Sequence, residues 1–160
     1  MKKINRVMAC FDFSDSSRDT VEYALELTRG KPIEILLFNV VNAKDVEAVR
    51  TASRYYPEAI DVDRYVEEAR ADRYKRLGEV IDEHFSADAA KIKRLVHVGI
   101  PFEEIINAVE TENIDLILMG NKGRTNLSRT LFGSNAEKVF RHSPVPVLSV
   151  RDHKRFGRNK

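Results

Sequence analysis

The stretch IDLILMGNKGRTNLSRTLFGSN, residues 114–135, decides the fold of this chain. It begins with an apolar run, LILM (116–119), which is typical of a short buried strand. Three of the chain's seven glycines then surround a polar loop. Glycine loses much conformational freedom on folding and packs nothing, so three in one loop indicate a special backbone shape or a close approach to another group. The sequence therefore predicts a strand, a loop that approaches something, and a helix beginning near Asn135.

Similar apolar runs occur elsewhere, and segments with helical spacing separate them. The helical segments contain residues 21–28 and 102–109, and a longer one covers about residues 61–85. This alternation predicts one α/β domain, a doubly wound parallel sheet of five strands with helices on both faces. Residues 42–60 fit the alternation least well, and we expect an excursion or lid with some helix there. The expected strands are VMACF (7–11), IEILLFNVV (33–41), RLVHV (94–98), LILM (116–119) and VPVLSV (145–150).

Composition and charge narrow the class of protein. Hydrophobic residues make up 42% of the 160 residues and charged residues 32%, which is ordinary for a globular domain. No apolar run approaches the ~20 residues that span a bilayer, and the N-terminus lacks a secretory pattern. A single cysteine, Cys10, excludes an intramolecular disulfide and suits a reducing cytoplasm, where we place the protein. The four histidines show no metal-ligand spacing.

Basic residues gather at the end of the chain. Residues 151–160 carry five Lys or Arg and one Asp, so residues 1–150 sum to −2 although the whole chain is +2. We therefore expect a basic C-terminal tail, residues 152–160, that is solvated. Neither a membrane nor a nucleic acid is expected as a partner.

The glycine loop has the features of a phosphate-binding site. Ligands of doubly wound sheets lie beyond the carboxyl ends of the strands, and Gly120 directly follows the strand at 116–119. The helix that begins near Asn135 would offer unpaired N–H groups and a partial positive charge, while Lys122 and Arg124 add positive charge nearby. The loop alone leaves an alternative open. Ser134 and Glu137 are also spaced as a capping box, which needs no ligand.

The end of the first strand favours the ligand site. If the first and fourth strands are neighbours, Asp12 and Gly120 face one crevice. A carboxylate repels phosphate, so we expect Asp12 to contact a base amino group, a ribose hydroxyl or a metal. The alternative role of Asp12 is to cap the following helix, although Ser14 and Asp15 fit that position better.

Several motifs, taken in order, resemble the universal stress protein family. The spacing Gly120-x2-Gly123-x9-Gly133-Ser134 is similar to the ATP-binding signature of that family. The other matching motifs are VMACFDFSDSS, ILLFNVV, HVGIPFEEI, DLILMGNKGR and HSPVPVLSVR. The resemblance spans about residues 3–151, which predicts a nucleotide-binding domain over 1–151 followed by the tail.

The resemblance implies a strand order of 3-2-1-4-5, a homodimer, and ATP held at the carboxyl ends of the strands. The cofactor would be ATP, AMP or another adenine nucleotide, with Mg2+ carried by the phosphates and no metal site in the protein itself. Phe11 and Asp12 would line the adenine and ribose side, Val40 would contact adenine, and Gly99 would lie near the base or ribose. The residues expected around the phosphates are Gly120, Asn121, Lys122, Gly123, Arg124, Gly133, Ser134 and Asn135.

Three asparagines depart from the family pattern. Asn121 stands where small hydroxyl residues are frequent, Asn39 where histidine is frequent, and Asn135 where an apolar residue or threonine is common. These departures change side-chain groups and leave the main-chain amides of the loop unaltered. Because the glycine signature is kept, the chain resembles the ATP-binding branch of the family.

The leading functional hypothesis is an ATP-binding regulatory protein of the stress response with a protein client that the sequence does not identify. No nucleophile elbow, acid–base pair or metal triad is recognisable, so no catalytic residue is predicted. The alternative is an enzyme, a slow ATP hydrolase or nucleotide transferase using the same crevice, which would need a base near the terminal phosphate. A receiver or a flavin carrier fits poorly, because Asp12 has no close acidic partner and the following SDSS lacks glycine.

Four further features carry expectations. The last strand, Val145 to Val150, should lie at a sheet edge and pair with a second copy to form the dimer. Cys10 is expected to be inert core packing, and His97 a strand residue with satisfied hydrogen bonds. Tyr55 and Tyr56 are expected to pack on the sheet.

Overall fold

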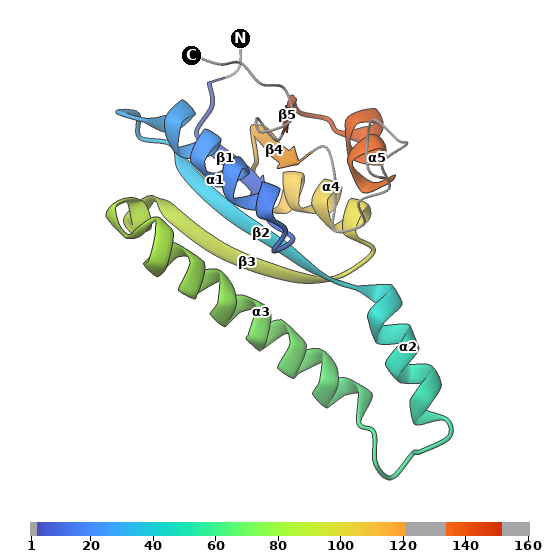
Figure 1. Cartoon of the computed structure of the whole chain (residues 1–160). Coiled ribbons are helices and arrows are strands. Elements are labelled where there is room, and N and C mark those ends of the chain that lie inside the picture. The colour runs from blue at the N-terminus through green and yellow to red at the C-terminus, as the bar shows by residue number, and fades with distance from the viewer. Residues whose placement is uncertain (1–2, 121–133, 152–160) are drawn as a thin grey trace.

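The computed structural model describes residues 3–120 and 134–151. Within them, five parallel strands form one sheet of order β3-β2-β1-β4-β5, which confirms the predicted fold (Figure 1). The strands are β1 (Arg6–Cys10), β2 (Glu34–Asn42), β3 (Ile92–Gly99), β4 (Leu116–Gly120) and β5 (Val147–Val150). The helices are α1 (Asp15–Thr28), α2 (Ala43–Ser53), α3 (Val62–His84), α4 (Pro101–Thr111) and α5 (Ser134–His142), with a 3-10 segment at Ser86–Lys91.

Strand β1 lies at the centre of the sheet. It pairs with β2 from Arg6↔Glu34 onward and with β4 from Val7↔Leu116 onward, so the winding direction reverses between β1 and β4. Parallel strands bring their carboxyl ends to one edge, and the first and fourth strands are neighbours as predicted. This edge, at the switch point, is where ligands of such sheets bind.

Both faces of the sheet are buried, because side chains alternate along each strand. On β2, Ile35, Leu37 and Val41 face the layer that contains α1 and α3, while Leu36 and Phe38 face α4 and α5. Leu37 is fully buried, as are Leu77 of α3 and Ile117 of β4. The two apolar layers hold the sheet rigid and fix the positions of the strand ends.

The segment that the sequence could not place forms a helical projection. Helix α2 follows β2 directly, with the side chain of Asn42 accepting a hydrogen bond from the Lys44 amide at 3.0 Å. Figure 1 shows α2 and the first half of α3 extending away from the sheet. We call residues 43–76 the arm. The expectation for Tyr55 and Tyr56 is wrong: their exposed fractions are 77% and 66%, because the arm carries them beyond the sheet.

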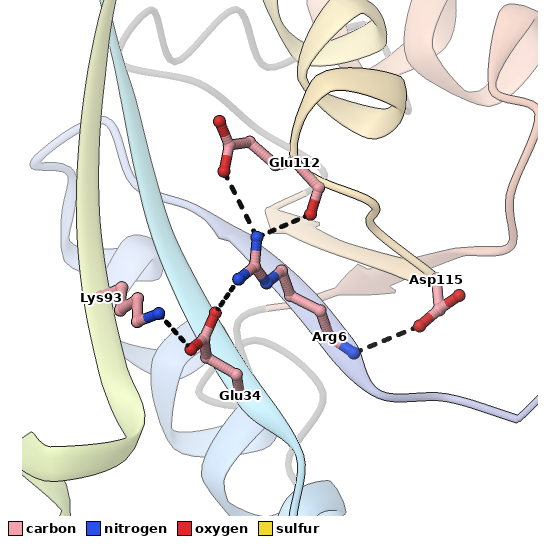
Figure 2. Close-up of polar contacts among 5 residues, drawn as sticks. All are labelled: Arg6, Glu34, Lys93, Glu112 and Asp115. Atoms are coloured by element: carbon pink, nitrogen blue, oxygen red, sulfur yellow. Dashed lines mark hydrogen bonds and ion pairs between the residues drawn. The ribbon is translucent and has the colours of Figure 1, made fainter.

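An ion-pair network closes the amino-terminal edge of the sheet (Figure 2). The Arg6 guanidinium contacts Glu34 of β2 at 2.5 Å and the Glu112 carboxylate at 3.3 Å, and it donates to the Glu112 carbonyl at 2.7 Å. Glu34 also pairs with Lys93 of β3 at 2.6 Å. The network therefore links β1, β2, β3 and the end of α4 on the side opposite the strand ends where ligands bind.

Asp115, just before β4, anchors the start of β1 at the same edge. Its Oδ2 atom accepts hydrogen bonds from the amides of Asn5 at 2.8 Å and Arg6 at 3.2 Å, and its own amide donates to the Arg6 carbonyl at 2.9 Å. Asp115 is only 8% exposed. A buried carboxylate that accepts main-chain N–H groups fixes the register of these two strands where the chain enters the sheet.

None of the helices in the described ranges is both long enough and apolar enough to cross a membrane.

Candidate functional site

A cavity of about 620 Å3 opens at the carboxyl edge of the sheet. Its volume lies within the usual range for small-molecule sites. The ends of β1, β2 and β4 form its floor, and the first turns of α1, α2, α4 and α5 surround it. Parallel connections start each of these helices at the same edge, so several positive helix ends gather there. Six predicted contact residues line the cavity, namely Phe11, Asp12, Val40, Gly120, Ser134 and Asn135.

The other predicted contacts lie elsewhere. Gly99, at the end of β3, is not part of the cavity wall formed by the described residues. The Glu104 side chain occupies the place where a Cβ at Gly99 would stand, so any larger residue there would require Glu104 to shift. The nucleotide role of Gly99 stays a prediction. Asn121, Lys122, Gly123, Arg124 and Gly133 lie outside the described residues.

Glu104 also explains the environment of His97. Its Oε2 atom lies 2.9 Å from Nδ1 of His97, whose ring packs edge-on against Phe38 at 5.1 Å. His97 therefore has the satisfied position on the strand that its sequence context predicts.

The turn after β1 is organised around the carboxylate of Asp12. Its Oδ1 atom accepts hydrogen bonds from the Ser14 amide at 3.0 Å and from the hydroxyls of Ser14 and Ser17, each at 2.5 Å. The Asp12 amide in turn donates to the Ser17 hydroxyl at 3.0 Å. Ser14 occupies the N-cap of α1 as predicted, but its side chain makes no capping bond, and its hydroxyl donates to Asp12.

Phe13 follows in a backbone conformation that is rare for a bulky residue. Its φ is 64°, in the left-handed region, where strain costs of the order of 1–3 kcal/mol. The surrounding side chains hold it there. The Phe13 ring packs edge-on against Phe11 at 5.3 Å, with the guanidinium carbons of Arg76 and Arg73 at 4.1 Å and 5.4 Å from its centroid. We call these four side chains the Phe13 clamp.

Asn39 gives the floor of the cavity an unused acceptor. Its Nδ2 atom donates to the Phe11 carbonyl at 2.7 Å, which fixes the orientation of the amide because a carbonyl can only accept. The residue is 3% exposed, and its Oδ1 atom has no donor among the described residues. A buried acceptor without a partner is costly.

Cys10 also borders the cavity, in surroundings that disfavour its thiolate form. Burial and then the nearby Asp12 carboxylate raise the pKa of the Cys10 thiol to about 12, so that the neutral form persists through the physiological range. This environment agrees with the inert role predicted for it.

The first turn of α5 supplies the opposite wall. Ser134, Asn135 and the buried Ala136 line the cavity there. Glu137 pairs with Arg141 one turn later at 3.0 Å. Ser134 is itself the first residue of the helix, so its own amide and that of Asn135 belong to the turn whose N–H groups have no intrahelical acceptor.

The arm adds residues that sequence reasoning missed. Asp45 from the first turn of α2 and Arg73 from the middle of α3 both line the cavity, as do Ser16 and Ser17 of α1. Asn42 could have been recognised from the sequence as an N-cap that starts α2. No pattern in the sequence indicates that Arg73 of α3 lies over the strand ends. Within the described ranges, no group of three or more His, Cys, Asp or Glu side chains could hold a metal ion.

The fold is a doubly wound parallel sheet with a cavity at its switch point and helix N-termini around it, which is where α/β proteins of this class bind ligands. Residues 3–151 match the sequence model of the universal stress protein family. The chain belongs to the universal stress protein family.

Individual relatives agree over nearly the whole chain. Universal stress protein MJ0577 of Methanocaldococcus jannaschii is 30% identical over 147 residues, covering 88% of this chain and 90% of the relative. Universal stress protein YxiE of Bacillus subtilis is 28% identical, covering 92% of this chain and 99% of the relative. The solved structure of MJ0577 matches this chain with a TM-score of 0.68 at 29% identity. The match covers 92% of this chain and 96% of that structure. The structure of a universal stress protein in complex with cAMP matches with a TM-score of 0.65 at 22% identity. That match covers 94% of this chain and 98% of the other.

Proposed function

We propose that this protein binds an adenine nucleotide, ATP first among them, and acts as a regulatory protein of the stress response. The observation that carries the proposal is the convergence of six predicted contacts on one cavity at the switch point of the sheet. Family membership over residues 3–151 supports it, as does the glycine signature of the sequence. One protein of the same fold is described in complex with cAMP, another adenine nucleotide.

The chemistry of the two cavity walls suits the two ends of such a molecule. Val40 and the ring of Phe11 offer apolar surface for a base, next to the amide of Asn39. The Oδ1 atom of Asp12 accepts the hydroxyl hydrogen of Ser14 within the turn. We expect the Asp12 carboxylate to lie beside the ribose of the nucleotide, away from the phosphates. The N-terminus of α5 with Ser134 favours negative charge at the other end.

Magnesium would accompany the phosphates. The described residues hold no metal-ligating cluster, and Asp12 and Asp45 are single carboxylates on the cavity wall. Mg2+ keeps several waters and takes few protein ligands when it binds with a nucleotide, so this wall is compatible with it. The chain's own residues would orient the nucleotide and exclude water from the base.

Calorimetric titration with ATP and MgCl2 tests the proposal, and we expect saturable binding to one site per chain. Replacing Gly123 and Gly133 together by valine should abolish it, because the glycine signature is expected to bring main-chain amides close to the phosphates. Circular dichroism checks that the double variant is folded. Failure of the folded wild type to bind any adenine nucleotide contradicts the proposal. Turnover in the same samples separates a binder from an efficient ATP hydrolase.

We further propose that two copies pair through β5, and that the dimer works in the cytoplasm with a protein client. Strand β5 forms one edge of the described sheet, with β4 on its other side. An edge strand carries main-chain groups that a second strand can pair with, despite Pro144 and Pro146 before it.

Light scattering tests the assembly. The wild type should have the mass of two chains at micromolar concentration, and Val147→Lys should have the mass of one, because it places a charge in the paired strands. Val147→Thr is the control, since it keeps the branched shape without the charge. A monomeric wild type, or a dimer of unchanged strength in Val147→Lys, contradicts this assembly.

A further inference from the structure

The arm meets the proposed nucleotide site in two ways: Asp45 and Arg73 line the cavity directly, and the Phe13 clamp joins α3 to the turn that carries Asp12. Phe13 lies between Asp12, which lines the cavity, and Ser14, which starts α1. Its ring contacts Phe11 on one side and the guanidiniums of Arg73 and Arg76 on the other. Both arginines come from α3, so the clamp joins a wall of the cavity to the helix that carries the arm.

The clamp holds a conformation that the chain would otherwise leave. A φ of 64° is unfavourable for phenylalanine, and it persists only where neighbouring contacts impose it. The same turn geometry lets the Asp12 carboxylate reach both the Ser14 amide and the Ser17 hydroxyl. If Phe13 relaxed to a negative φ, these hydrogen bonds would break and the Asp12 side chain would leave its place in the cavity wall.

Arg76 makes the closer of the two cation–π contacts, at 4.1 Å, and it does not line the cavity. Arg73 both contacts Phe13, at 5.4 Å, and lines the cavity. The two arginines are three residues apart and therefore lie on one face of α3, above the turn. Phe13 is thus the contact that connects Arg76 to the cavity wall, whereas Arg73 could also touch a ligand directly.

We infer that Arg76 and Phe13 are positioning residues for the nucleotide site, and that the arm is coupled to occupancy of that site through them. The inference rests on the proposed nucleotide function. A ligand that needs Asp12 in place favours the clamped arrangement, and by linkage a firmly packed α3 favours the ligand. The arm ends at the exposed Tyr55 and Tyr56, so this coupling would let nucleotide binding change how firmly a protruding aromatic tip is held.

The test compares three variants of the full chain. Arg76→Ala removes the cation above the ring, Arg76→Lys restores a cation, and Lys75→Ala removes one positive charge from a neighbouring position that is 77% exposed. Two quantities are measured for each variant. One is the Kd for ATP with Mg2+, and the other is the amide hydrogen-exchange rate of residues 12–17 in the nucleotide-free protein.

We expect Arg76→Ala to raise both the Kd and the exchange rate about fivefold, the upper end for one lost cation–π contact at an exposed position, since the Arg76 side chain is 45% exposed. Arg76→Lys should stay within about threefold of the wild type, because an ammonium is also attracted to the ring. Lys75→Ala should change neither quantity. Phe13→Tyr should have the Kd and the exchange rate of the wild type. Phe13→Leu should raise both quantities as much as Arg76→Ala does.

The two measurements separate this inference from the proposed function. If the wild type binds no nucleotide, the proposed function fails, and the exchange rates still show whether Arg76 holds the turn. Unchanged exchange of residues 12–17 in Arg76→Ala overturns the inference even if binding weakens, because Arg76 would then act on the ligand or on net charge. Equal losses in Lys75→Ala and Arg76→Ala overturn it as well.

Discussion

Replacing Asp115 by alanine is expected to lower the free energy of unfolding by about 3 kcal/mol. Its carboxylate is the acceptor for the amides of Asn5 and Arg6, at 2.8 Å and 3.2 Å, in a residue that is 8% exposed. Figure 2 shows the contact with Arg6. Alanine leaves the Arg6 amide without an acceptor and removes a negative charge beside the Arg6 ion pairs. Since this edge starts both β1 and β4, loosening it weakens the centre of the sheet.

Urea denaturation measures this effect. The urea midpoint should fall while the slope stays the same, because the variant and the wild type expose about the same amount of surface on unfolding. Asp115→Asn should lose about half as much stability, about 1.5 kcal/mol, since the amide oxygen still accepts but carries no charge. Asp82→Ala, at an exposed position of α3, is the control and should be close to neutral. A loss below about 1 kcal/mol for Asp115→Ala would show that the carboxylate is not an anchor.

Replacing Asn135 by aspartate is expected to weaken nucleotide binding about thirtyfold, or about 2 kcal/mol, while leaving the protein folded. The change exchanges one atom for another of similar size and adds one negative charge in the first turn of α5, on the cavity wall. A carboxylate there favours the helix by about 0.3–1 kcal/mol, because it faces the positive helix end. The same charge repels a polyphosphate, so stability and affinity should move in opposite directions.

Ionic strength and two further variants make the result specific. The loss should shrink between about 20 mM and 500 mM salt, because exposed charges are screened. Asn135→Ala should bind within about threefold of the wild type if main-chain amides hold the phosphates. Asn107→Asp adds the same charge at an exposed position in the middle of α4 and should have no effect. Equal affinity of Asn135→Asp and the wild type would place the negative end of the ligand elsewhere.

The sequence predicted much of the candidate site because its residues lie at strand ends and helix starts. Phe11 and Asp12 end an apolar run, Gly120 ends another, and Ser134 starts a helix with a recognisable first turn. In a doubly wound sheet these positions must meet at one edge, whatever the details of packing. Local pattern and topology together therefore predict which side chains share a cavity.

The position of the arm could not be predicted from the sequence, and the reason is physical. Helix α2 has little apolar surface, with Val46 its one buried residue, so the segment shows no clear periodicity. Charged side chains cover most of the first half of α3 and leave the direction of the helix undetermined by burial. Tyr55 and Tyr56 were expected to pack on the sheet, but the length of the two helices carries them away from it.

Local patterns in the sequence predicted the alternating order of strands and helices, the sheet that follows from it, and the edge at which a ligand would lie. Periodicity of apolar residues and the handedness of parallel connections are enough for these conclusions. Only the three-dimensional packing showed that Arg73 and Arg76 of α3 contact Phe13, whose φ is 64°. Contacts between residues about sixty positions apart depend on the direction and curvature of helices, which no local pattern encodes.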